Sequence, residues 1–470
     1  MRERRLHRRL ASCAGMAAVA FGCLCNPVAA FAQAETGPLT LNDAVQRALK
    51  NYPSIKERRA RAQAAEEDVG VARTAYLPRL DLYWQENRAT TNNVFGLLFP
   101  QSTIFSMTGP VLGTRSLSDS VWGSAGAVLL SWEAIDFGQR KASVEAARAQ
   151  ASFAKNQTAV AELDVASAAA DAFLTVLAAD ESVRAIRANV DRLQVFANTV
   201  RTLVQNQLRP GADQSRAEAE LAIANNQLSQ AVQIADLARA SLADAVGSPG
   251  ASFELMPGSL AAVPQVSVPQ ADPKAHPAAR AGQAAVDVVR ARERALDAAY
   301  FPRILLQSTF AGRGTGADAP GVPSYGNGLW LQVPNWAVGA SVTFPAFDIF
   351  GINARKRVEM QNELAESAHY DQTIQSLTTQ EVKARALMKA ATDIANNTPV
   401  ELQAAAAGES QARARYQNGL ASITEVAEAQ RLLAQAEADN AVARLGVWRA
   451  LLAAAQARGD LAPFLEQTNR

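Results

Sequence analysis

The stretch from Val183 to Val204 reads VRAIRANVDRLQVFANTVRTLV, and its apolar residues recur at alternating spacings of three and four. A repeat of 3.5 residues is typical of a helix that packs against a second helix in a left-handed coiled coil. No proline interrupts the chain back to Gly138. The pattern therefore predicts a single helix over residues 138–204, on the order of 100 Å long.

A second helix follows at once. After the turn Leu208-Arg209-Pro210-Gly211, the same spacing resumes and runs from Leu221 to Ala245, which predicts a helix over residues 213–247. Because the turn is short, the two helices should form an antiparallel hairpin. Many seam positions are alanine, so the helices can approach closely and neighbouring hairpins can assemble into a curved wall.

The N-terminus has the features of an export signal. Five arginines fall within Met1–Leu10, an apolar run continues to Phe31, and Ala30-Phe31-Ala32 is a cleavage site, so residues 1–32 are predicted to be a signal peptide. Cys13, Cys23 and Cys25 all lie inside it, which predicts an exported chain without thiols, with lipidation of Cys23 or Cys25 as an alternative. A net charge of +1 and abundant alanine argue against nucleic-acid binding.

The chain contains an internal repeat. Tyr76-Leu77-Pro78-Arg79 returns 224 positions later as Tyr300-Phe301-Pro302-Arg303, and Asp136-Phe137-Gly138 returns as Asp348-Ile349-Phe350-Gly351. Such a correspondence indicates a tandem duplication. The predicted division is a first repeat over residues 33–247, a linker over 248–275, a second repeat over 276–457 and a C-terminal tail over 458–470.

Each repeat should consist of a helix, two strands, a long helix and a shorter helix. The two prolines at 78 and 302 end helices and push the chain toward extended geometry, so strands should follow. The remaining predicted helices are 52–77, 277–300, 351–416 and 424–456, and the predicted strands are 80–90, 121–133, 303–311 and 336–346.

The strands indicate a membrane sheet. They are about ten residues long, as in transmembrane barrels, and alternate between apolar and polar residues. Aromatic residues stand at both ends of the apolar face, as in a membrane girdle; these are Trp84, Trp122, Trp132, Trp336 and Phe344. A soluble sandwich with interior aromatics is the alternative.

Four strands cannot close a barrel, because about eight are needed. An open sheet would also leave unpaired backbone groups in hydrocarbon. The predicted fold is therefore an α+β membrane protein in which three chains form a 12-stranded transmembrane β-barrel that continues as an α-helical barrel. A periplasmic coiled-coil adaptor and a structural coiled-coil trimer are rival classes.

Catalytic and metal-binding functions lack candidate residues. After removal of the signal peptide only His276 and His369 remain as histidines, with no cysteine, and no nucleophile or phosphate-binding motif occurs. Gly312, Gly314 and Gly316 stand between predicted strands, with no helix after them to bind phosphate. We expect neither an enzyme nor a cofactor or metal site.

The stretch from Arg415 to Val426, RYQNGLASITEV, together with the Pro-Arg helix ends and the Asp-Phe-Gly corner, resembles the TolC-like outer membrane efflux protein family. The resemblance covers nearly the whole exported chain. It implies a homotrimeric, passive channel in the outer membrane that extends into the periplasm. Through a periplasmic adaptor it would serve an inner-membrane transporter of the RND, ABC or MFS class. Small-molecule or metal efflux is favoured, and type I protein secretion is the alternative.

The resemblance also implies a gate at the helix turns. The family's acidic and tyrosine gate positions correspond to Asp213 and Tyr416, and its two inward acidic rings correspond to Glu425 and Glu428. Where the best-known members carry a gate arginine this sequence has Ala421, and Gln207 replaces the glycine of the first turn. Compensation could come from Arg209, Arg216 or Arg415. A helix cap at Asp213 and solvated glutamates are the simpler alternatives.

The same two turns are the predicted contacts of the adaptor, because they should be the irregular backbone at the far end of the tube. Their residues are Leu208, Arg209, Pro210, Gly211, Gly419, Leu420, Ala421 and Ser422.

Overall fold

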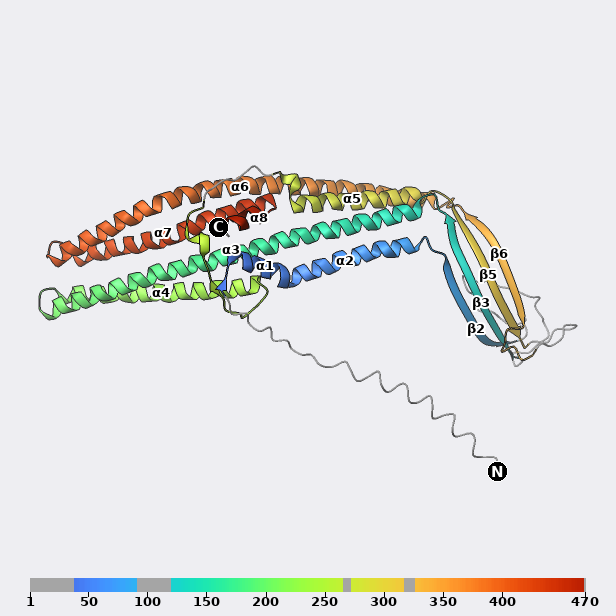
Figure 1. The fold of residues 1–470 in the computed structure, drawn as a ribbon, viewed down its shortest axis with the longest axis horizontal. Coiled ribbons are helices and arrows are strands. Elements are labelled where there is room, and N and C mark those ends of the chain that lie inside the picture. The colour runs from blue at the N-terminus through green and yellow to red at the C-terminus, as the bar shows by residue number, and fades with distance from the viewer. Residues whose placement is uncertain (1–37, 91–119, 265–271, 317–325, 469–470) are drawn as a thin grey trace, which may run out of the picture.

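The computed structural model describes residues 38–90, 120–264, 272–316 and 326–468, and the predicted signal peptide lies outside them. In these residues the molecule is an elongated bundle of helices with a β-sheet at one end (Figure 1). The elements are β1 (Pro38–Leu39), α1 (Leu41–Asn51), α2 (Pro53–Thr74), β2 (Arg79–Thr90), β3 (Ser120–Ile135), α3 (Gln139–Gln205), α4 (Gly211–Ala245), β4 (Glu254–Leu255), η1 (Gly258–Ala261), η2 (Pro273–Ala275), α5 (Pro277–Ala298), β5 (Arg303–Thr315), β6 (Val333–Thr343), α6 (Ile349–Gln417), α7 (Ile423–Arg458) and α8 (Ala462–Thr468).

The order of elements in the first half recurs in the second. The series α2, β2, β3, α3, α4 is matched by α5, β5, β6, α6, α7. The matching helices also agree in length: α2 and α5 have 22 residues each, α3 and α6 have 67 and 69, and α4 and α7 have 35 and 36. In each half the two shorter helices lie along one long helix (Figure 1).

Several boundaries differ from those predicted. The predicted strand 336–346 is β6, which begins three residues earlier and includes Pro334. A proline is tolerated there because β6 lies at the edge of the sheet. The predicted helix 52–77 ends at Thr74, and Pro53 separates it from α1. The predicted linker contains β4, η1 and η2, and the predicted tail contains α8.

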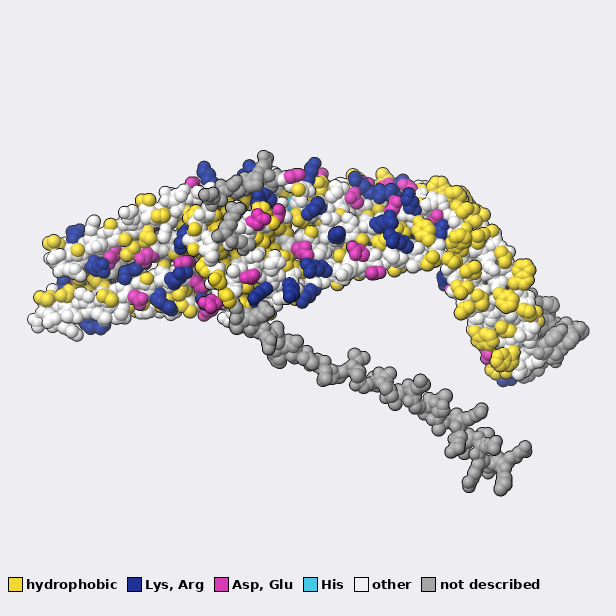
Figure 2. All heavy atoms as spheres, in the orientation of Figure 1, with side chains coloured by type: hydrophobic (Ala, Val, Ile, Leu, Met, Phe, Trp, Pro, Cys, Tyr) yellow, Lys and Arg dark blue, Asp and Glu magenta, His cyan; other side chains and the backbone are white. Residues whose placement is uncertain are grey.

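The sheet has the order β2-β3-β5-β6, with every neighbouring pair antiparallel. The pairing of β3 with β5 joins the two halves of the chain, and β2 and β6 are the edges. Residues opposite one another share a face, so Leu82, Val128 and Phe310 lie side by side. This face is covered by apolar side chains (Figure 2).

The opposite face of the sheet is more polar. It presents Tyr83, Gln85 and Asn87 from β2 and Gln307 and Thr309 from β5, in alternation with the apolar residues. The two faces therefore differ as expected for a sheet with hydrocarbon on one side and a polar space on the other.

The hairpin of α3 and α4 packs through small residues. The predicted seam positions Leu193, Ala197 and Val200 of α3 are buried. The buried residues of α4 are mostly the predicted alanines, at Ala224, Ala231, Ala235 and Ala238 among others. In the described part of the chain, no helix is both long enough and apolar enough to cross a membrane.

The main core lies in the middle of the bundle. Phe173 and Leu174 of α3 and Trp448 of α7 are buried there with residues of α1 and α8. Trp448 Nε1 donates to the carbonyl of Ala262 at 3.0 Å, and its ring meets Phe464 of α8 edge-on at 6.2 Å. The short helices therefore pack against the long ones in the middle of the bundle: α1 contacts α3, and α8 and η1 contact α7.

His276 connects two helices of this region. Its Nδ1 accepts a hydrogen bond from Ala278 N at 3.1 Å and caps α5, so Nε2 carries the proton and donates to the carbonyl of Gln456 at 3.1 Å. The ring is buried, and burial lowers the pKa of His276. The folded protein therefore holds a neutral imidazole.

We expect His276 to make stability depend on pH. The unfolded chain binds a proton near pH 6.5 and the folded one only at lower pH, so folding stability is lost as pH falls below about 6.5. His276→Asn keeps a capping side chain but removes the bond to Gln456, at a cost of about 1 kcal/mol at neutral pH. Thermal unfolding of the helices by circular dichroism, at pH values on either side of about 6.5, should show a smaller pH dependence in the variant. Equal pH dependence of the two proteins would contradict this role.

Candidate functional site

The two helix turns lie together at the end of the bundle far from the sheet (Figure 1). Both use the same backbone geometry. Leu208 N bonds to Leu203 O and Leu420 N bonds to Arg415 O, each at 2.8 Å, as in a Schellman motif. The left-handed residue is Gly419 in the second turn and Gln207 in the first, with φ of 76° and 59°. Gln207 therefore adopts the conformation for which glycine is usual, at a cost of about 1 kcal/mol.

Tyr416 is the central side chain of this tip. It comes from the last turn of α6 and is only 1% exposed. Its ring lies 5.7 Å from the ring of Phe196 of α3, in a cluster that also contains Val200 and Val426. Tyr416 thus joins one hairpin to the other through apolar contact.

Asp213 binds the hydroxyl of Tyr416. The Tyr416 Oη donates to Asp213 Oδ2 at 3.0 Å, across a separation of 203 residues in the chain. Burial, with the hydrogen bond to Asp213 as the next cause, raises the pKa of Tyr416 to about 12. Asp213 lies in the first turn of α4, where the helix dipole favours a carboxylate, but Pro210 is the N-cap and no side chain caps this helix. Asp213 therefore does not cap α4; it binds the hydroxyl of Tyr416 on the other hairpin.

Arg209 covers the other side of Tyr416. Its guanidinium carbon lies 4.3 Å from the centre of the Tyr416 ring, and its Nη2 donates to the backbone carbonyl of Tyr416. Of the three arginines considered from sequence, Arg209 is therefore the one that contacts the tyrosine. Arg415 instead donates to Leu420 O at 3.3 Å, and Arg216 is exposed on α4.

Glu425 and Glu428 occupy a different environment. Glu425 forms a capping box with Ser422 at the start of α7 and lies 3.6 Å from Arg415 Nη1. Glu428 forms an ion pair with Arg431. Both carboxylates are largely exposed on the single chain. The structure thus brings Asp213 and Tyr416 together, while the two glutamates remain on the surface.

The side chains of the predicted contact turns differ in how far they are exposed. Leu208 and Leu420 are 67% and 70% exposed at the tips of the two turns, whereas Ala421 is buried in the cluster around Tyr416. Two apolar side chains on neighbouring turns are suited to contact another protein.

A second hairpin-to-hairpin contact lies farther from the turns. Arg192 of α3 donates to both carboxylate oxygens of Glu437 of α7, at 3.0 and 2.6 Å. Both side chains are partly buried. Such a bidentate pair fixes geometry as well as charge.

The predicted girdle residues are exposed in the described structure. Trp336 is 76% exposed, and Trp84, Trp122, Trp132 and Phe344 are also exposed. Trp132 Nε1 donates to Tyr76 O at 3.1 Å where the sheet meets the helices. Trp330, Phe347 and Phe350 are not among the predicted girdle residues, yet they are more exposed than most of them. These three residues lie outside the predicted strand 336–346 but within a few positions of its ends, and this closeness could have identified them as part of the girdle.

A match to a protein family and matches to solved structures show which proteins this chain is similar to. The sequence matches the outer membrane efflux protein family over residues 44–248 and 271–460. A search of curated proteins finds no match.

Solved structures with the same fold include three outer-membrane proteins. VceC from Vibrio cholerae is 18% identical, with 89% of this chain and 96% of that chain covered and a TM-score of 0.71. The CmeC outer membrane channel of Campylobacter jejuni is 16% identical, with 91% and 89% covered and a TM-score of 0.72. The open state of the MtrE outer membrane channel of Neisseria gonorrhoeae is 20% identical, with 89% of each chain covered and a TM-score of 0.69.

The family match spans both halves of the chain, including the sheet, the long helices and the tip. The resemblance noted from the sequence is thereby confirmed. This chain belongs to the outer membrane efflux protein family and lies in the outer membrane, extending into the periplasm.

Proposed function

We propose that three copies of this chain form the passive exit duct of a tripartite export system, which serves an inner-membrane transporter through a periplasmic adaptor. The observation that carries the proposal is the sheet: four strands, two free edges and one apolar face. Small molecules or metal ions are the favoured cargo.

The edges of the sheet require partners. On β2 and β6, every second backbone N–H and C=O points away from the sheet, and hydrocarbon offers these groups no hydrogen bond. If β6 of one chain pairs with β2 of the next, three chains close a barrel of twelve strands. Twelve is an even number well above the minimum of eight. The apolar face then meets lipid and the polar face lines the pore.

The helices offer matching surfaces. Ile234 and Leu237 of α4 and Leu387 and Ile394 of α6 are large apolar side chains left exposed on the single chain. Ile234 and Leu237 are three positions apart on α4, and Leu387 and Ile394 are seven apart on α6, so each pair lies on one face of its helix. We propose that they pack between chains and close the helices into a tube.

Assembly is the direct test. Native mass spectrometry of the detergent-solubilised protein should give a trimer, and the trimer should conduct ions in a planar bilayer. Leu237→Asp should lower the trimer fraction, because it would place a charge in the proposed contact between chains. A monomer or dimer that conducts would rule out the architecture.

Tyr416, Asp213 and Arg209 form the proposed latch that holds the periplasmic end closed. The hydroxyl bond, the stacked guanidinium and the apolar cluster all join the α6–α7 hairpin to the α3–α4 hairpin. A single hydrogen bond to a charged group is worth about 1.5–3 kcal/mol, so three such latches can hold a closed end that a partner can still open.

Removing the latch should favour the open state. Tyr416→Phe deletes only the hydroxyl bond to Asp213, and Arg209→Ala deletes the stacked cation. Each should raise the mean single-channel conductance in a planar bilayer, and the double variant should raise it less than additively because both act on one ring. Arg216→Ala, on the same helix end, is the matched control and should leave the conductance unchanged. Wild-type conductance in Tyr416→Phe, in Arg209→Ala and in the double variant would place the gate elsewhere.

Glu425 and Glu428 are proposed to add negative charge at the mouth. In a trimer their six carboxylates would surround a threefold axis and favour cations. Arg415 and Arg431 lie beside them in each chain and would weaken this field. The selectivity of the mouth therefore depends on how these four side chains are oriented in the assembled tube.

The exposed leucines are the proposed docking contacts for the adaptor. Leu208 and Leu420 stand at the tips of adjacent turns, and they are the exposed large apolar side chains of these two turns, residues 206–210 and 418–422. An adaptor with an apolar hairpin tip would bury both.

Charge at these positions should block export without affecting assembly. Leu420→Asp or Leu208→Asp should reduce drug or metal resistance in cells at least tenfold. Trimer yield and bilayer conductance should stay at wild-type levels, because both side chains are mostly exposed in the free protein. Loss of trimer instead of docking would assign the turns a structural role.

A further inference from the structure

A notch lies in the apolar face of the sheet, where the two halves of the chain meet. Gly126 of β3 and Gly312 of β5 are directly opposite each other, and the same row continues to Trp84 and Pro334. Neither glycine places a side chain on this face, so the two strands leave a recess here, and Leu331 packs over part of it.

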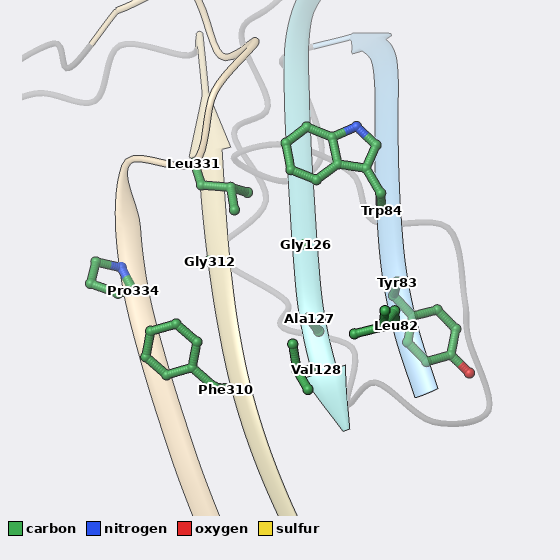
Figure 3. Close-up of a pocket in the computed structure, with 10 residues that line it drawn as sticks. All are labelled: Leu82, Tyr83, Trp84, Gly126, Ala127, Val128, Phe310, Gly312, Leu331 and Pro334. Atoms are coloured by element: carbon green, nitrogen blue, oxygen red, sulfur yellow. The ribbon is translucent and has the colours of Figure 1, made fainter. Parts of the chain in front are cut away.

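Larger apolar side chains surround the two glycines. Figure 3 shows Leu82, Trp84, Val128, Phe310, Leu331 and Pro334 around the space, which has a volume of about 480 Å³. A volume of this size lies in the ~300–1,000 Å³ range of sites that hold small ligands. All of these side chains are apolar, so an apolar occupant is favoured.

Leu331 reaches the notch from outside the strands. A Cβ on Gly312 would lie 3.0 Å from the Leu331 Cβ, and one on Gly126 would lie 3.1 Å from its Cδ1. A Cβ on Gly314 would overlap the carbonyl of Trp330. The glycines of β5, unassigned from sequence, therefore allow the segment before β6 to lie against the sheet.

The notch stands where the apolar face ends. Beyond Trp84, on the same face of β2 and away from the helices, come Glu86 and Arg88. Arg88 Nε donates to Ser120 Oγ at 3.1 Å, and its guanidinium lies 5.7 Å from the Trp122 ring. Trp330 is exposed nearby on the covering segment. A change from apolar to charged residues with tryptophans at the boundary is typical of a membrane–water interface.

We infer that this notch binds an acyl chain of a lipid of the outer leaflet, with the lipid headgroup toward Arg88. The inference rests on the proposed orientation of the sheet, with its apolar face toward the membrane. The helices extend into the periplasm, so the end of the sheet away from them is the external end. The notch opens on the face of the sheet, whereas neighbouring chains would pair with the outer backbone groups of β2 and β6, so this pairing leaves the face of the notch toward the lipid.

Retention of a defined lipid tests the site. The trimer in detergent would be incubated with dipalmitoyl phosphatidylethanolamine, exchanged into lipid-free detergent and weighed by native mass spectrometry. Wild type should retain one lipid per chain. Val128→Phe should fill the notch and reduce retained lipid roughly tenfold, equivalent to ~1.4 kcal/mol of binding free energy. Val338→Phe, on the same face but outside the notch, should retain as much as wild type.

Leu331→Ala provides a second variant that leaves the strands unchanged. It removes one wall and should also lower retention, whatever the effect of Val128→Phe on folding. Equal retention by wild type and Val128→Phe, or equal loss in Val338→Phe, would overturn the assignment. So would the absence of retained lipid in wild type.

A separate measurement distinguishes failure of the site from failure of the proposed architecture. The exported chain is predicted to lack cysteine, so Val338→Cys can carry a single fluorophore. Quenching by brominated lipid in a bilayer should occur if the apolar face meets the membrane, independently of the notch. Quenching without lipid retention would refute the notch alone, and no quenching would refute the orientation of the sheet.

Discussion

The hydrogen-bonding capacity of the two sheet edges is the constraint on which the assembly depends. A soluble sheet can leave its edge groups to water, but a sheet in hydrocarbon cannot, because each unpaired group costs several kcal/mol. Four strands with β2 and β6 at the edges are therefore an incomplete unit. The proposed trimer follows from this deficit, and the pairing of β3 with β5 fixes how much of the ring each chain supplies.

In the proposed trimer the helices would continue the ring of strands as a tube, because the helices of the two halves of the chain match in length. The 67-residue α3 and the 69-residue α6 each begin a few residues after a strand and end at the same tip. Alanine at the seam lets the shorter helices lie close beside them. Small seam residues contribute little hydrophobic free energy each, so the stability of the wall depends on its length and on the core around Phe173 and Trp448.

Local signals in the sequence predicted the long elements, and tertiary contacts determined the rest. Heptad spacing and the prolines at 78 and 302 placed every long helix and every strand of the large sheet within a few residues. The segments α1 and α8 were missed because they are short, and their burial comes from contacts with α3 and α7. Likewise, sequence named Arg209, Arg216 and Arg415 together, and only the approach of the two turns selects Arg209.

A latch at Tyr416, as proposed, would allow a rigid tube to have a movable end. Its contacts to Asp213 and Arg209 lie at the turns, and its contact to Phe196 lies between two and three turns from the end of α3. The bidentate pair of Arg192 and Glu437 lies about 6 Å beyond Phe196 along α3. Breaking the contacts of Tyr416 would separate the ends of the two hairpins, while the ion pair of Arg192 and Glu437 would still join the hairpins on the side toward the sheet. In the proposed mechanism, a partner that opens the tip must compensate the hydrogen bonds of Tyr416 to Asp213 and Arg209, the stacked guanidinium and the apolar contact with Phe196 in each chain. The proposed opening would leave most of the packing between the long and short helices intact, so it would be local and reversible.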